Sequence, residues 1–220
     1  MTTFGFSAFL RLLSLTPKPQ RREVVNRLTP SDGGYDFHRS LRLKAARLVL
    51  GGEDLADLAR EAARLSNPSE RRSVQTGLTQ LGAWRMLTPG DAVSVGPALF
   101  VSPGEAFRVK FAPDFGLRAG GATLAVHMWN TSSVELSAAM TYVALALASS
   151  AYDAAEAPDD LAVLSLPDSR LYRLSEAPEQ GRLSAIVVQN LEALFDSVRA
   201  QIQTPAISPI PDPPRPSADA

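Results

Sequence analysis

Two residues whose side chains could bind a ligand, His127 and Trp129, lie in one apolar segment, which ends with Val126-His127-Met128-Trp129. An alternation of period two predicts a β-strand here, with His127 and Trp129 on the same face. A His beside a Trp could line a pocket that stacks a base or holds another ligand. The structural alternative is that Trp129 belongs to the core and His127 is a hydrogen-bonded polar residue beside it, since large aromatic side chains are mostly buried.

Asp114 is the candidate for acid or metal chemistry. It follows Pro113 and directly precedes an expected strand at 115–118. A carboxylate in that place could hold a divalent cation. An Asp after a Pro is equally typical of a turn, so both interpretations stay open.

The composition excludes several classes of site. The chain of 220 residues has no Cys, which rules out disulfide scaffolds, zinc ribbons, iron–sulfur clusters and thiol nucleophiles. Its two His residues, His38 and His127, are too few for a multi-His metal site. The sequence also lacks a phosphate-binding loop, a dinucleotide fingerprint and a Gly-x-Ser-x-Gly elbow. We therefore assign no metal ligand, expect no cofactor, and favour a protein that is not an enzyme.

Charge is distributed unevenly along the chain, although its formal net charge is −1. Residues 1–89 carry 14 Lys and Arg against eight Asp and Glu, and residues 90–220 have the opposite excess. This asymmetry suggests a nucleic-acid surface on the basic half, or simply Arg side chains on solvated helix faces. The candidate nucleic-acid-binding residues are Arg21, Arg22, Arg39, Arg42 and Arg47.

Hydrophobic periodicity divides the chain into three parts. Residues 1–88 are expected to form a helical, basic module, with helices near 6–13, 20–28, 37–48, 53–65 and 68–86. Residues 89–203 change to period two and are expected to form a mixed α/β domain. Its expected elements are strands at 92–101, 107–111, 115–118 and 123–129, a helix from about 132 to 152, strands at 161–166 and 171–174, and a helix at 183–202. Residues 204–220 hold at least six Pro residues and are expected to be a disordered tail.

Two apolar segments were considered as targeting or membrane elements. Phe4–Leu15 is interrupted by Arg11 and lacks the flanks of a signal peptide. Leu136–Tyr152 contains several hydroxyl side chains and fits a buried core helix better than a membrane span. We expect a cytoplasmic protein with no membrane partner.

The order of these elements resembles the core of the PD-(D/E)XK nuclease superfamily over about residues 97–175. Pro113-Asp114 opens a strand, a Gly-rich hairpin follows, then Leu124–Trp129, a capped helix and an apolar strand. The resemblance implies a mixed-sheet α/β sandwich in which Asp114 stands at the first acid. It also implies that His127 and Trp129 stand where that family has its second acid and its Lys. His and Trp do not replace a carboxylate and an ammonium for Mg²⁺ chemistry.

The sequence therefore predicts an α+β or α/β protein that binds nucleic acid, or a protein acting on it, without cleaving it. One alternative is a metal-dependent nuclease that uses Asp114 with Mg²⁺ and further acids such as Glu105 or Glu135. Another is a protein–protein adaptor that docks the apolar helix at Phe4–Leu15 on a partner. The oligomeric state is left open.

Overall fold

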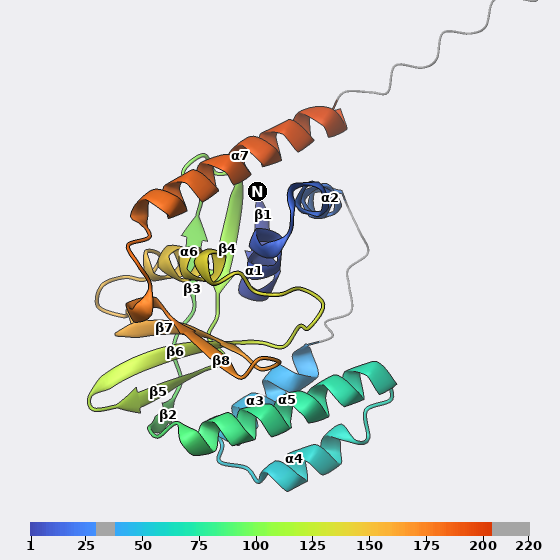
Figure 1. Cartoon of the computed structure of the whole chain (residues 1–220), viewed down its shortest axis with the longest axis vertical. Helices are drawn as coiled ribbons and strands as arrows, with labels where there is room; N and C mark the ends of the chain where they lie inside the picture. The colour runs from blue at the N-terminus through green and yellow to red at the C-terminus, as the bar shows by residue number, and fades with distance from the viewer. Residues whose placement is uncertain (30–37, 204–220) are drawn as a thin grey trace, which may run out of the picture.

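The computed structural model describes residues 1–29 and 38–203. Within them, two mixed β-sheets are packed with helices, which confirms the expected α+β class (Figure 1). The expected Pro-rich tail at 204–220 and part of the loop after the second helix lie outside the described residues.

The larger sheet has five strands in the order β2-β5-β6-β7-β8. Their bounds are Asp91–Val93, Phe115–Ala119, Ala122–Trp129, Asp160–Ser165 and Arg170–Arg173. Strands β5 and β6 form an antiparallel hairpin through Gly120 and Gly121, whose positive φ angles suit a tight turn. Helix α6 (Ala138–Ser149) then crosses over, so that β7 returns parallel to β6.

The smaller sheet has three strands in the order β1-β4-β3, with bounds Thr2–Gly5, Phe107–Phe111 and Ala98–Val101. Strand β1 pairs in parallel with β4, about a hundred residues away in the sequence. The expectation that residues 1–88 form only helices is therefore wrong at residues 2–5. A four-residue strand is too short for a clear period-two signal, and its partner is far away in the chain.

Helices cover both faces of the five-stranded sheet. Helices α3 (Arg39–Val49), α4 (Leu55–Ala62) and α5 (Pro68–Leu87) lie on one side, in the lower part of Figure 1. Helices α1 (Phe6–Ser14), α6 and α7 (Gly181–Gln203) pack on the other side, and α2 (Pro17–Leu28) packs against α7. The 3₁₀ turn η1 (Leu174–Glu176) precedes α7.

Alternation along β6 sends side chains into two separate cores. Ala125 and Trp129 face the core of α1, α6 and α7, whereas Val126 and Met128 face the core of α3–α5. The boundary expected at residue 88 does not separate these cores, because β1, α1 and α2 contribute to the first and α3–α5 to the second. Trp84 of α5 lies against Phe115 of β5, with ring centroids 6.0 Å apart, and so joins the helices to the sheet.

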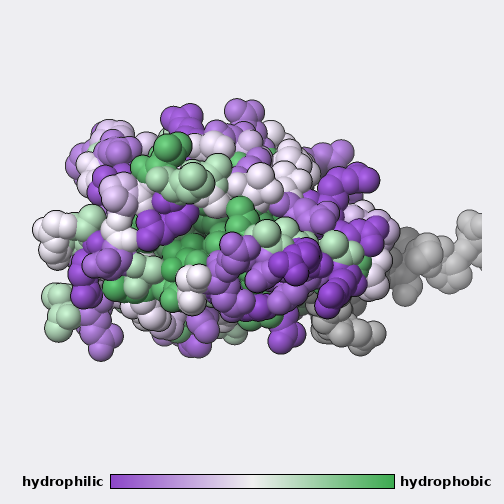
Figure 2. Space-filling view, turned by 90° about the horizontal axis from the view of Figure 1, so that it is seen from below, coloured by the Kyte–Doolittle hydropathy of each residue, from purple (hydrophilic) through white to green (hydrophobic). Residues whose placement is uncertain are grey.

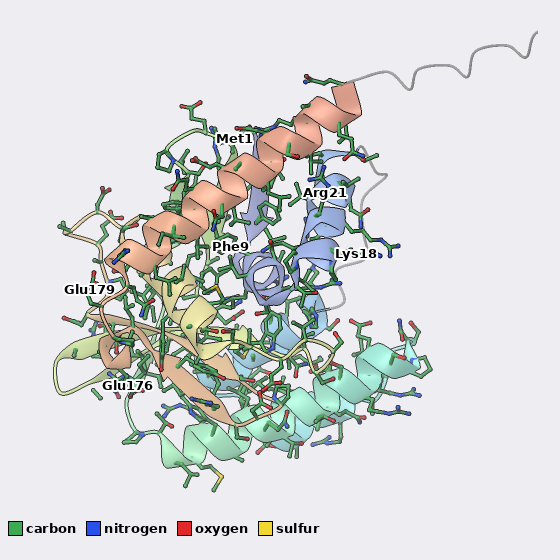
Figure 3. All side chains as sticks on the ribbon, turned by 45° about the horizontal axis from the view of Figure 1, so that its top comes forward. Met1, Phe9, Lys18, Arg21, Glu176 and Glu179 are labelled. Carbon is green, nitrogen blue, oxygen red and sulfur yellow. The ribbon has the colours of Figure 1, made fainter. Side chains whose placement is uncertain are left out.

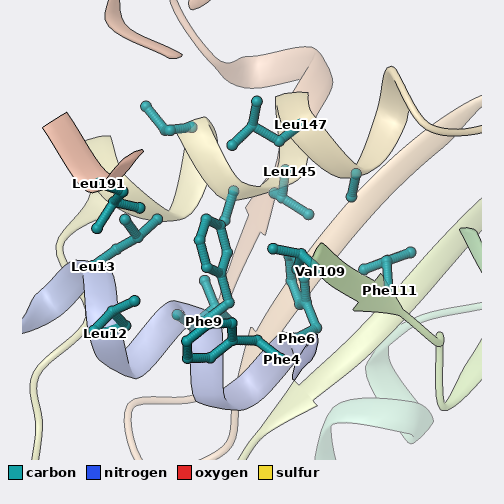
Figure 4. Close-up of a cluster of buried hydrophobic side chains, with 14 of the residues drawn as sticks. Phe4, Phe6, Phe9, Leu12, Leu13, Val109, Phe111, Leu145, Leu147 and Leu191 are labelled. Atoms are coloured by element: carbon teal, nitrogen blue, oxygen red, sulfur yellow. The ribbon is translucent and has the colours of Figure 1, made fainter. Parts of the chain in front are cut away.

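Helix α1 belongs to the interior of the protein. Phe4, Phe6 and Phe9 are at most 2% exposed and pack with β4, α6 and α7 (Figure 4). The adaptor hypothesis is wrong in its choice of surface, because the apolar side of Phe4–Leu15 is already covered by the chain itself. On the face seen from below, Figure 2 shows apolar side chains gathered in the centre and surrounded by hydrophilic ones.

Two element boundaries differ from expectation for local reasons. The strand expected at 92–101 is two strands in different sheets, broken around Gly96 and Pro97, where Pro has no N–H for a ladder. The helix expected from Ser132 begins after Ser137, whose side chain accepts from the backbone N–H of Met140. By contrast, α5 begins where the sequence places it, after Asn67, whose side chain accepts hydrogen bonds from the backbone N–H groups of Ser69 and Glu70. No helix in residues 1–29 or 38–203 has the length and apolar character needed to cross a membrane.

Candidate functional site

The candidate site is a pocket of about 660 Å³ at the N-terminal end of α1. Its walls come from that helix end, from β4 and β6, and from side chains of α2 and α3. Its lining includes Gly5, Phe6, Ser7, Ala8, Arg11, Glu23, Arg27, Arg42, Lys110, Ala112, His127 and Trp129. The volume lies within the range typical of pockets for small ligands.

His127 forms the inner wall of this pocket and is 3% exposed. Its ring lies edge-on to Phe6 at 5.1 Å between centroids. The Oγ atom of Ser7 lies 2.7 Å from Nε2 of His127, which is a short hydrogen bond between α1 and β6. These two residues are 120 positions apart in the sequence.

Asp114 lies on the other side of the imidazole. Its Oδ2 atom is 3.4 Å from Nδ1 of His127 and accepts a hydrogen bond from the backbone N–H of Met128 at 2.7 Å. The carboxylate is nearly buried, with 5% of its side chain exposed. A negative charge on this side favours the imidazole tautomer with its proton on Nδ1, which leaves Nε2 to accept the proton of the Ser7 hydroxyl. Ser7, His127 and Asp114 thus form a hydroxyl–imidazole–carboxylate series.

The ionisation of His127 is set mainly by its burial. Removal from water disfavours the charged ring and lowers the pKa of His127 below its usual 6.5. The Asp114 carboxylate and the Ala112 carbonyl act in the opposite direction, and Arg42 adds to the lowering. The imidazole is therefore neutral at pH 7 and can act as a proton acceptor.

The opening of the pocket is strongly basic. Among the residues that the structure describes, Arg11, Arg27, Arg42 and Lys110 line it together with one carboxylate, that of Glu23. Glu23 forms an ion pair with Arg27, at 3.3 Å between Oε1 and Nε.

Within the part of the chain that the structure describes, Arg11 and Lys110 have no ion-pair partner, and both side chains are exposed. The pocket therefore favours an anionic ligand.

The five arginines predicted from the sequence do not form one surface. Arg42 lines the pocket, whereas Arg22 and Arg39 are exposed outside it. Arg21, labelled in Figure 3, donates to Ser197 and Gln201 on α7 at 3.1 and 2.8 Å. Arg47 is bound by the carboxylates of Glu53 and Glu61. The guanidinium groups of Arg21 and Arg47 are thus engaged by neighbouring side chains, and nucleic-acid binding by the five arginines stays a prediction.

The expected pair His127 and Trp129 does lie on one face of β6, and both residues line the pocket. Trp129 is 2% exposed and packs in the core, so its ring has no free face on which a base could stack. The structural alternative holds for Trp129, while His127 is both hydrogen-bonded and at the pocket wall.

The acids considered for a metal site are dispersed. Asp114 is near His127, Glu105 lies in the turn between β3 and β4 with a φ of 53°, and Glu135 is exposed before α6. Among residues 1–29 and 38–203, no three His, Cys, Asp or Glu side chains are grouped so that they could hold a metal ion.

Ser7, Arg11 and Lys110 are the site residues that sequence reasoning missed. A partial signal exists, since Gly5-Phe6-Ser7-Ala8-Phe9 matches the first three positions of Gly-x-Ser-x-Gly and has Phe at the last. This partial motif can be interpreted only with the structure, in which strand β1 ends at Gly5 and helix α1 begins at Phe6.

Comparisons with known proteins add little to this geometry. No protein-family model matches the chain, and no curated protein matches it. Among solved structures, one described as "Crystal structure of SSO0001" is similar over 88% of this chain and 85% of that one, at 15% sequence identity and a TM-score of 0.31. A likeness at this level indicates nothing about function, so the site is interpreted from its own residues.

Proposed function

We propose that the protein binds nucleic acid, without cutting it, by holding a phosphate group in the basic pocket at the N-terminal end of α1. The observation that carries this proposal is that, among residues 1–29 and 38–203, the pocket is lined by more cationic side chains than carboxylates, with Arg11 and Lys110 exposed at it. Phosphate groups are the sequence-independent part of a nucleic acid, and Arg and Lys contacts to them supply most of the nonspecific affinity.

Two further features support an anionic ligand. Helix α1 begins at the pocket with Gly5 as its N-cap, without a side-chain cap and without an acidic residue in its first turn. The first N–H groups of a helix lack intrahelical acceptors and carry the positive end of the helix dipole. Phosphate is favoured at such a position when cations surround it, as Arg11 and Lys110 do here.

The nuclease-like resemblance supports a role on nucleic acid but not metal-dependent cleavage. The antiparallel β5–β6 hairpin, the α6 crossover and the parallel strand β7 follow the expected order. Where the resemblance places the second acid and the Lys, β6 carries His127 and Trp129. Asp114 is engaged with His127 and with the backbone of Met128. Binding without cutting is the function that fits these residues.

The test is a fluorescence-anisotropy titration of labelled single- and double-stranded DNA at several salt concentrations, with and without Mg²⁺. We expect affinity that falls steeply with salt. Arg11→Gln and Lys110→Gln should each weaken binding and reduce the slope of log affinity against log salt by about one. Arg22→Gln, an exposed cation outside the pocket, is the matched control and should change the slope less.

Each other outcome contradicts a defined part of the proposal. No binding at low salt would refute the nucleic-acid function and favour a protein partner. Equal losses in Arg11→Gln and Arg22→Gln would refute the pocket as the binding site. Mg²⁺-dependent degradation of the DNA on a gel, abolished by Asp114→Ala, would favour the nuclease alternative.

A further inference from the structure

Ser7, His127 and Asp114 are arranged as a nucleophile, a base and an orienting acid. Ser7 Oγ lies 2.7 Å from Nε2 of His127, which is the distance at which an imidazole accepts the hydroxyl proton. On the far side, Asp114 Oδ2 lies 3.4 Å from Nδ1. That separation is longer than a good hydrogen bond, and within this structure Nδ1 has no hydrogen-bond partner among the described residues. Catalytic hydrogen bonds are often long before substrate binds.

The local backbone resembles a nucleophile elbow in its order of elements. Strand β1 ends at Gly5 and Ser7 is the second residue of α1, so the hydroxyl stands between a strand and a helix. Ser7 does not have the positive φ of a strained elbow, and Phe9 replaces the second glycine of the motif. The position nevertheless puts the hydroxyl beside the first N–H groups of the helix, where an oxyanion would be stabilised.

Access to the hydroxyl comes through the pocket described above. Ser7 is partly exposed and lines that pocket, as do Ala8 and His127. Asp114 is nearly buried behind the imidazole and is not among the residues that line the pocket. The three groups therefore have the accessibility that their roles require: an open nucleophile, a base at the wall, and a shielded carboxylate.

We propose that Ser7 is a catalytic nucleophile that hydrolyses carboxylic esters bearing a negatively charged group, with His127 as the general base and Asp114 as a positioning residue. Ser7 Oγ attacks the carbonyl carbon while its proton passes to His127 Nε2, and the oxyanion forms at the N-terminal end of α1. The carbon–oxygen bond to the alcohol breaks, and His127 returns the proton to the departing oxygen. Water then attacks the acyl-serine, His127 takes its proton, and Ser7 is released with that proton as the acid departs.

The basic opening of the pocket determines the substrate class. Arg11 and Lys110 lie where the anionic group of a substrate would enter, so a charged ester should react faster than a neutral one of similar size. This inference goes beyond nucleic-acid binding, which requires the cations but not a reactive hydroxyl.

The first test uses no substrate. The 220-residue chain is incubated with a fluorophosphonate probe and examined by intact-mass and peptide mass spectrometry. We expect one adduct, located on Ser7, and none in Ser7→Ala. Ser14→Ala is the matched control, because Ser14 is in the same helix and donates only to the carbonyl of Leu10. Absence of an adduct in the wild type, or the same adduct in Ser7→Ala, overturns the proposal.

The second test separates chemistry from structure. Hydrolysis of 4-nitrophenyl acetate is compared with that of the mono-4-nitrophenyl ester of succinic acid. We expect the charged ester to be preferred, Lys110→Gln to lower kcat/KM for the charged ester more than for the neutral one, and Ser7→Ala to abolish turnover of both. His127→Gln should lower kcat/KM by about 10²–10⁴-fold. The wild-type pH profile should reach half its plateau below pH 6.5, the usual pKa of His, which a structural role would not produce.

The results also keep the two proposals apart. Salt-dependent DNA binding with no Ser7 adduct refutes the nucleophile and leaves the binding function intact. A Ser7 adduct in a protein that does not bind DNA refutes the binding function and leaves the esterase inference intact.

Discussion

Truncation of Phe9 in α1 tests whether this helix is part of the interior or a surface for a partner. Phe9 is fully buried, and its ring lies 6.5 Å from that of Phe4 and 6.0 Å from that of Phe107. Phe9→Ala removes a whole aromatic ring from this core. Such substitutions lower the free energy of unfolding by about 3–5 kcal/mol, a large part of the total of about 5–15 kcal/mol of a folded protein.

The assay is urea unfolding, monitored by circular dichroism and by Trp fluorescence. For a chain of this length, the same loss corresponds to a fall in Tm of about 6–20 °C. Arg11→Ala is the control on the same helix: because Arg11 is exposed, its unfolding free energy should change by no more than about 0.5 kcal/mol. If Phe9→Ala were as stable as Arg11→Ala, the assignment of α1 to the interior would be refuted.

Three further substitutions test other parts of the structure. Burial lowers the pKa of His127 in the folded state, so the unfolded chain takes up a proton at a higher pH than the folded chain does. The free energy of unfolding should therefore fall as the pH drops below about 6.5, by at most about 1.4 kcal/mol per pH unit. His127→Gln should remove this dependence in urea titrations at about pH 5.5–7.5. Gly116→Ala would place a Cβ atom 2.6 Å from Cγ2 of Val95 and should cost about 1–3 kcal/mol in thermal unfolding. Asp160→Ala removes the acceptor of Arg173 Nε and of both donors of Ser175, and should cost about 1–3 kcal/mol in the same assay.

Each of these expectations has a control. His38→Gln should leave a pH dependence that His127→Gln abolishes, and an unchanged dependence in His127→Gln would contradict the burial argument. Gly96→Ala has no atom within 4 Å of the new Cβ and should be nearly neutral. Asp153 is exposed, so Asp153→Ala should leave the thermal stability unchanged. If Asp153→Ala lowered it as much as Asp160→Ala does, the hydrogen bonds of Asp160 would be shown to contribute little.

Part of this structure follows from sequence alone because the responsible interactions are local. The Asn67 side chain caps α5 a few residues away, and this signal is read directly from Asn67-Pro68-Ser69-Glu70. The period-two pattern places His127 and Trp129 on one face of β6, as the structure has them. The change from helical to strand periodicity near residue 90 likewise gave the correct fold class.

The candidate site could not be derived in the same way, because its members are distant in the chain. Ser7 meets His127 only because β1 pairs with β4 and thereby sets the start of α1 beside β6. Charge pairing was also not predicted from the sequence. Arg47 is a candidate nucleic-acid-binding cation by sequence, whereas in the structure it forms ion pairs with the carboxylates of Glu53 and Glu61.

The sequence by itself therefore determined most element types and their order, apart from β1 and the break between β2 and β3, since helix caps and side-chain alternation depend on spacings of a few residues. Only the tertiary structure decided which charges are paired, that the apolar face of α1 is interior, and that a serine and a histidine meet at one pocket with an aspartate behind the imidazole. The last two outcomes depend on strand pairing between segments about a hundred residues apart, which short-range patterns do not specify.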